Sequence, residues 1–225
     1  MIYHRQYQAE NYPLQDFKIE SIPDQILRSI MELSVGTGAL IRGGLCYYLH
    51  THDESYLLKD IDMIGLVSIQ EQALNILHKS SKEIYINHNH AMKTVITAFW
   101  PNDNKFFKLD LLLLEENPGC IEIRRGDKNM MCAPLDYILF DRLSKIAERD
   151  IRAHSIQKTL NHYKVVNKIT DHMLQSGLFQ LKTSKDLFCD LIHRAKAQLI
   201  PIIGYDEAEV FEKHLNLLHE GCEAK

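Results

Sequence analysis

The stretch Ala39-Leu-Ile-Arg-Gly-Gly-Leu-Cys-Tyr-Tyr-Leu49 changes its pattern at two adjacent glycines. The apolar run before Gly43 and Gly44 has the length of a short strand, and the residues after them are apolar at helical spacing. We therefore predict a strand, a tight glycine turn and a helix. Glycines in such a turn let backbone N–H groups approach a ligand, and the N-terminus of a helix favours an anion.

An acidic pair follows this turn. The stretch Lys59-Asp-Ile-Asp-Met-Ile-Gly65 places Asp60 and Asp62 two positions apart among apolar residues. Side chains at i and i+2 of a strand point to the same face and lie about 6.5 Å apart. Two carboxylates on one face, beside a turn that binds anions, are suited to a divalent cation that also contacts phosphate oxygens.

A third acid, Asp110, lies in the middle of the apolar run 106–114, which has the length of a strand. A charge in such a run is costly unless it is paired or bound to a metal. Asp110 is therefore a candidate metal ligand. The alternative is a buried ion pair between Asp110 and a basic residue such as Arg42.

The order of these features resembles that of the nucleotidyltransferase superfamily, which has the polymerase-beta-like fold: a glycine pair, an Asp-x-Asp pair and a lone Asp in a later strand. The resemblance covers roughly the first half of the chain. It is strongest to the AbiE-type nucleotidyltransferase toxins of bacterial toxin–antitoxin and abortive-infection systems. Asp141-Arg142-Leu143 loosely matches an acid-base-Leu stretch that these toxins carry after the catalytic domain. One departure is Leu45, because the superfamily usually has Ser or Thr directly after the glycines.

The resemblance implies an α/β (α+β) nucleotidyltransferase fold with a mixed sheet at residues 1–128 and an all-helical C-terminal domain at residues 129–225. It implies that Asp60, Asp62 and Asp110 are catalytic and bind Mg²⁺ or Mn²⁺, and that an NTP is the substrate. The residues expected to bind the nucleotide are Arg42, Gly43, Gly44, Arg142 and Lys145.

A basic stripe supports the last two of these assignments. Arg142, Lys145, Arg149 and Arg152 are spaced three, four and three residues apart, which places them on one face of a continuous helix. From residue 142 to residue 168 the chain has seven Lys or Arg and two acids, one of which, Asp150, is an additional candidate site acid. This local charge of +5 suits a triphosphate or an RNA backbone, and the alternative is a solvated face.

The remaining helices and strands are predicted from the spacing of apolar residues and from glycines and prolines that interrupt it. We expect a helix within 17–35, with Pro23 near its start, and a second helix at 68–79 with a capping box formed by Ser68 and Glu71. Strands are expected at 83–86 and 94–100, with a short edge strand at 121–124. Four helices are expected in the C-terminal part, at 135–147, 151–174, 184–199 and 206–219, with breaks at Gly177, Pro201 and Gly204.

The composition indicates the class of protein and its cellular environment. The 225 residues are 45% hydrophobic and 25% charged, which is ordinary for a soluble globular protein, and the net charge of −4 indicates no overall preference for nucleic acid. The five cysteines form no Cys-x-x-Cys pair, so we expect reduced thiols in a cytoplasmic protein. No apolar run approaches the roughly 20 residues of a membrane span.

We therefore expect a Mg²⁺-dependent enzyme that transfers a nucleoside monophosphate from an NTP to an RNA, such as a tRNA 3′ end, or to a protein hydroxyl. As a toxin it would have an antitoxin protein as its partner. Two alternatives stay open. One is a nucleotidyltransferase for a small, aminoglycoside-like molecule, which the local +5 charge disfavours. The other is a catalytically degenerate binding module with this fold, which Leu45 suggests.

Overall fold

The computed structural model describes residues 1–88, 94–116, 121–125, 128–148, 156–177 and 185–223. The chain forms two compact units, Met1–Pro134 and Leu135–Lys225. The sequence-based boundary after residue 128 stays a prediction. In the structure that residue begins a strand, Lys128–Cys132, which pairs within the first unit.

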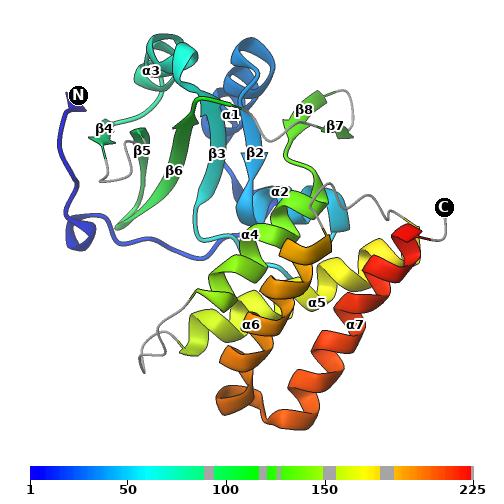
Figure 1. Ribbon diagram of the computed structural model, residues 1–225. Coiled ribbons are helices and arrows are strands. Elements are labelled where there is room, and N and C mark those ends of the chain that lie inside the picture. Colours follow the sequence, from blue (N-terminus) through cyan, green and yellow to red (C-terminus); the bar gives the residue numbers. More distant parts are fainter. Residues whose placement is uncertain (89–93, 117–120, 126–127, 149–155, 178–184, 224–225) are drawn as a thin grey trace. The chain divides into compact units, whose positions relative to one another are not determined.

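The first unit is built on an eight-stranded mixed sheet. The strands are β1 (Ile2–Tyr3), β2 (Leu40–Arg42), β3 (Ile61–Leu66), β4 (Glu83–His88), β5 (Thr94–Asn102), β6 (Lys105–Leu114), β7 (Ile121–Arg125) and β8 (Lys128–Cys132). Their order across the sheet is β1-β4-β5-β6-β3-β2-β8-β7 (Figure 1). The pairs β1–β4, β3–β6 and β2–β8 are parallel and the others antiparallel, which confirms the mixed sheet expected from the sequence.

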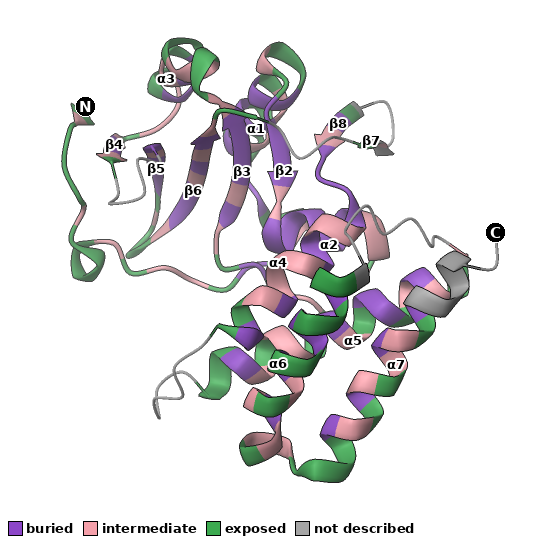
Figure 2. Cartoon of the chain, viewed as in Figure 1, coloured by how far each residue is buried: buried purple, intermediate pink, exposed green. Residues whose placement is uncertain are grey.

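The central strands β3 and β6 carry the deepest part of the core. Leu109, Leu111 and Leu113 of β6 are buried at alternate positions, as the two-residue period of a strand requires. Figure 2 shows buried residues concentrated in β2, β3 and β6 and in the helix that follows β2. The side chain of Asp110 belongs to the opposite, less buried set of positions on β6.

The helices of the first unit are α1 (Asp24–Thr37), α2 (Gly43–Thr51) and α3 (Gln70–His78). Helices α1 and α3 lie side by side (Figure 1). Helix α1 begins at Asp24, directly after Pro23 at the N-cap, which agrees with the predicted helix start near Pro23. The predicted capping box is wrong: Ser68 lies in the 3₁₀ turn Val67–Ile69, and the N-cap of α3 is Ile69, which makes no side-chain cap.

The N-terminal segment packs against the sheet. The ring of Tyr12 stacks on that of Phe99 with centroids 4.0 Å apart, and the ring of Tyr7 meets Phe99 edge-on at 5.0 Å. The segment also supplies β1, a strand that the sequence did not predict because two residues carry no periodicity.

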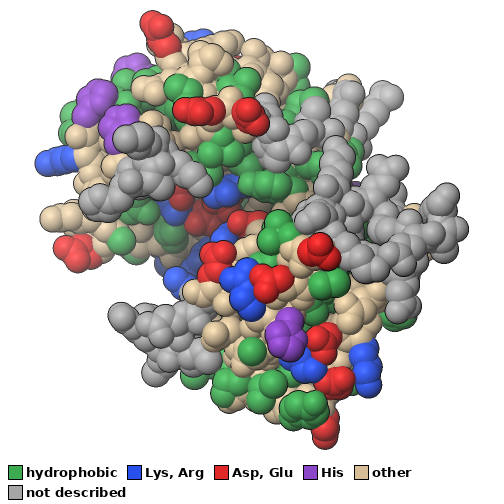
Figure 3. Space-filling view, viewed as in Figure 1, with side chains coloured by type: hydrophobic (Ala, Val, Ile, Leu, Met, Phe, Trp, Pro, Cys, Tyr) green, Lys and Arg blue, Asp and Glu red, His purple; other side chains and the backbone are tan. Residues whose placement is uncertain are grey.

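The second unit consists of the helices α4 (Leu135–Ala147), α5 (Ile156–Ser176), α6 (Lys185–Ile203) and α7 (Tyr205–Glu223), which confirms a helical C-terminal part. Pro201 lies inside α6, so its prediction as a break is wrong, whereas Gly204, with φ of 89°, separates α6 from α7. On the face seen in Figure 3, acidic and basic side chains are interspersed over this unit. None of the helices in the described ranges combines the length and hydropathy that a bilayer crossing requires.

Candidate active site

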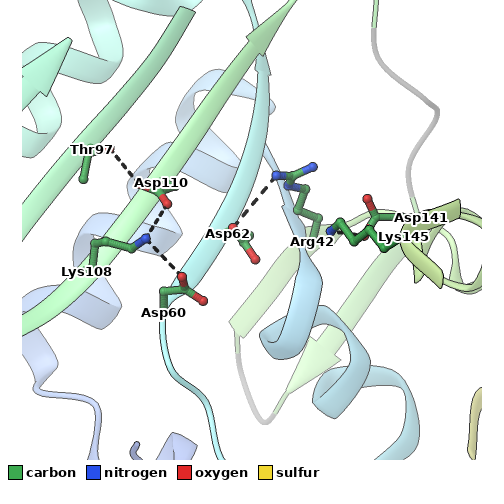
Figure 4. Close-up of polar contacts among 8 residues, drawn as sticks. All are labelled: Arg42, Asp60, Asp62, Thr97, Lys108, Asp110, Asp141 and Lys145. Carbon is green, nitrogen blue, oxygen red and sulfur yellow. Dashed lines mark hydrogen bonds and ion pairs between the residues drawn. The ribbon is translucent and has the colours of Figure 1, made fainter. Parts of the chain in front are cut away.

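The structure brings the three predicted aspartates together. Asp60 immediately precedes β3, Asp62 lies within it, and Asp110 is opposite Asp62 in the parallel register of β3 and β6. One carboxylate oxygen from each residue lies within 4.8 Å of the other two (Figure 4). Carboxylate oxygens at such separations are the hard ligands that Mg²⁺ and Mn²⁺ prefer. The donor set therefore fits a divalent cation.

A lysine that the sequence analysis did not select lies among these carboxylates. The Nζ of Lys108 is 2.7 Å from Oδ2 of Asp110 and 3.1 Å from Oδ2 of Asp60 (Figure 4). Its side chain is only 10% exposed. The ion-pair alternative for Asp110 named Arg42 as the partner, and the structure gives Lys108 instead. The sequence could have indicated this pair, because residues 108 and 110 have the same two-residue spacing as Asp60 and Asp62 and therefore share one face of a strand.

Hydrogen bonds fix both oxygens of Asp110. The hydroxyl of Thr97, directly opposite on β5, donates to Oδ1 at 2.7 Å, while Lys108 binds Oδ2. Burial of Lys108 disfavours its charge, but the neighbouring Asp110 and Asp60 outweigh burial and raise the pKa of Lys108 above its ordinary value. The charged form of Lys108 is therefore favoured between Asp60 and Asp110.

Arg42 lies on the other side of Asp62. It is the last residue of β2 and the N-cap of α2, and the sheet register sets it opposite Asp62. Its Nη2 is 3.9 Å from Oδ1 of Asp62, which is a loose ion pair. The Nε of Arg42 is buried, and no residue in the described ranges accepts a hydrogen bond from it. Because its side chain is 22% exposed and its ion pair with Asp62 is loose, the Arg42 guanidinium can also contact a further anionic group.

The two glycines are needed for close packing at the start of α2. Gly43 has φ of 66°, and a Cβ atom there would overlap Oδ2 of Asp62. A Cβ atom on Gly44 would lie 2.9 Å from the ring of Tyr56. Leu45, at the position where the superfamily usually has a hydroxyl, is only 2% exposed and belongs to the core. The turn thus brings the Asp62 carboxylate against the first residues of α2.

Gly43→Ala should therefore damage both the fold and the site. A residue with a Cβ atom at this φ costs about 1–2 kcal/mol, and the overlap would displace the Asp62 carboxylate. We expect a lower melting temperature and weaker Mn²⁺ binding, measured by thermal unfolding and isothermal titration.

Gly36→Ala is the matched control. Gly36 lies within α1 with nothing within 4 Å of its Cβ position, so alanine should stabilise the chain by about 0.5–1 kcal/mol. Unchanged Mn²⁺ affinity in Gly43→Ala would show that the turn does not position Asp62.

The predicted basic residues of the second unit have partners of their own. On α4, the Nζ of Lys145 is 2.7 Å from Oδ2 of Asp141. Arg142 donates from Nη1 to Nδ1 of His162 on α5 at 3.2 Å. The other members of the basic stripe, Arg149 and Arg152, and the candidate site acid Asp150 lie outside the described residues. Nucleotide binding by Arg142 and Lys145 stays a prediction.

Neither models of known protein families nor curated proteins match the sequence. Solved structures do match the fold. An antigenic nucleotidyltransferase-like protein from Paracoccidioides brasiliensis aligns with a TM-score of 0.56 at 9% identity, over 90% of this chain and 95% of that chain. This chain has the nucleotidyltransferase fold. At 9% identity the likeness is one of fold, and the narrower resemblance to AbiE-type toxins stays a prediction.

Two further structures align at lower TM-scores. A candidate nucleotidyltransferase from Helicobacter pylori has a TM-score of 0.48 at 12% identity, over 89% of this chain and 95% of that chain. The antibiotic-resistance factor ANT(2'')-Ia, in complex with adenylyl-2''-tobramycin, has a TM-score of 0.42 at 11% identity, over 67% of this chain and 97% of that chain.

Proposed function

We propose that the protein is a nucleotidyltransferase that depends on a divalent cation and uses an NTP. The observation that carries this proposal is the meeting of Asp60, Asp62 and Asp110 within 4.8 Å, beside a glycine turn and in a nucleotidyltransferase fold. A lone acidic cluster would be weaker support, because exposed acids often gather without binding a metal. Here the cluster is partly buried, and the fold delivers its members from two adjacent strands.

The three carboxylates would hold Mg²⁺ or Mn²⁺. When bound, such an ion neutralises charge on a triphosphate and lowers the pKa of an acceptor hydroxyl. Thr97 and Lys108 hold the Asp110 carboxylate in one orientation, which pre-organises the site for its ligand.

Arg42 and the start of α2 would bind the phosphates. The Arg42 side chain lies beside Asp62 and is 22% exposed, so a phosphate oxygen is a suitable partner for its guanidinium. The backbone N–H groups at the N-terminus of α2 favour the same negative charge. With Leu45 in the core, triphosphate binding would depend on these groups and not on a hydroxyl after the glycines.

For the acceptor we propose an RNA, such as a tRNA 3′ end, or a protein hydroxyl, and for the biological role a toxin restrained by an antitoxin protein. The support is the sequence resemblance together with the basic residues of α4 and α5. A small cationic acceptor would favour an acidic surface in place of these basic residues.

The test is transfer of label from each of the four NTPs, labelled at the α-phosphate. Reactions contain Mg²⁺ or Mn²⁺ and, in separate arms, total tRNA, cell extract or an aminoglycoside. We expect label on RNA or protein from one NTP, and its loss on addition of EDTA. Label on the aminoglycoside alone would replace the proposed acceptor, and no transfer in any arm would contradict the proposed activity.

A further inference from the structure

The acidic cluster already contains a fixed cation. The Lys108 ammonium lies 3.1 Å from Asp60 and 2.7 Å from Asp110, so it bridges two of the three carboxylates that would otherwise repel one another. The aspartate side chains are 34% and 22% exposed, whereas that of Lys108 is 10% exposed. The ammonium is thus the most deeply buried charge of the three.

The net charge of the cluster favours one divalent cation over two. Three carboxylates carry a formal −3 and Lys108 together with Arg42 carries +2, which leaves −1; one divalent cation changes this to +1, and a second would change it to +3. A second ion between Asp60 and Asp110 would have to lie where the Lys108 ammonium now contacts both carboxylates. It would also lie close to a buried ammonium, where repulsion is only weakly screened.

We propose that Lys108 takes the place of a second metal ion, so that the three carboxylates bind a single divalent cation. This inference rests on the proposed function, because it concerns the metal site of that function. Lys108 acts on the acceptor and the nucleotide only through Asp60 and Asp110, and it is a positioning residue. Removal of its charge opens a second cation position between those two carboxylates.

The test is a Mn²⁺ titration of the full chain, followed by electron paramagnetic resonance of the free ion. The variants are Lys108→Met, which keeps the length of the side chain without its charge, and Lys105→Met as the control. Lys105 is exposed and lies on the same strand away from the cluster. We expect one bound ion in the wild type and in Lys105→Met, and two in Lys108→Met.

Thermal unfolding gives a second measurement. Without metal, Lys108→Met removes a positive charge that offsets repulsion among the three carboxylates. Its melting temperature should therefore fall below that of the wild type. Excess Mn²⁺ should raise it by more than it raises the wild type. If Lys108→Met fails to fold, the wild-type stoichiometry decides alone: one ion supports the inference and two ions overturn it.

Other results of the Mn²⁺ titration also test the inference. One ion in Lys108→Met, at any affinity, would show that Lys108 orients the carboxylates without replacing an ion, and would overturn the inference. Two ions in the wild type would overturn it while leaving the proposed function intact. No bound ion in any of the three proteins would contradict the proposed function itself.

Discussion

Asp62→Asn should lower the rate of nucleotidyl transfer by about 10³-fold, because loss of a metal ligand removes several kcal/mol of transition-state stabilisation. The substitution keeps the size of the side chain and removes only its charge. Asp62 is the member of the cluster that lies against the glycine turn and faces Arg42, so its charge links the cation to the phosphates. Single-turnover label transfer, with the NTP and acceptor identified first, measures the effect.

Asp103→Asn is the matched control for this substitution. Asp103 is an exposed acid in the turn between β5 and β6, with φ of 51°, a conformation that asparagine adopts readily. Its variant should transfer label at the wild-type rate. Transfer by Asp62→Asn at the wild-type rate would place the chemistry elsewhere in the chain.

A divalent cation should also stabilise the folded chain in the absence of nucleotide. An ion at about 100 times its Kd contributes about 2.7 kcal/mol, which corresponds to a rise of about 5–10 °C in melting temperature for a chain of this size. The physical reason is that the native state gathers three carboxylates within 4.8 Å and the unfolded chain does not. Thermal unfolding with Mg²⁺, with Mn²⁺ and with EDTA measures the shift.

Asp110→Asn should remove most of this shift, because it takes away one of the three charged ligands. Asp103→Asn should retain the shift in full. An equal rise in melting temperature for Asp110→Asn and for the wild type would mean that the stabilising ion binds at another place.

The central features of the fold could be predicted from local pattern. The glycine pair marks a change from strand to helix, and β2 and α2 begin and end close to the predicted residues. The proximity of Asp110 to Asp60 and Asp62 could not be predicted from spacing along the chain. It followed from the resemblance to a fold that pairs the two strands, and the parallel register of β3 and β6 produces it.

Other features depend on tertiary contacts that no local pattern reports. The spacing of Lys108 and Asp110 within one strand allows their ion pair, but the contact of Lys108 with Asp60 depends on the pairing of β3 with β6. Strand β8 pairs with β2 at a single register position, Ile41 with Cys132, which only the folded sheet reveals. Pro201 continues a helix because packing of α6 against α7 outweighs the local cost of proline.

The most direct test of the metal site is a crystal structure of the protein with Mn²⁺ and a non-hydrolysable NTP analogue, with anomalous diffraction data that locate the ion. We expect one anomalous peak contacted by oxygens of Asp60, Asp62 and Asp110 at roughly 2.0–2.2 Å, with the triphosphate beside Gly43 and Arg42. A Mn²⁺ ion and nucleotide bound away from these aspartates would contradict the proposed site.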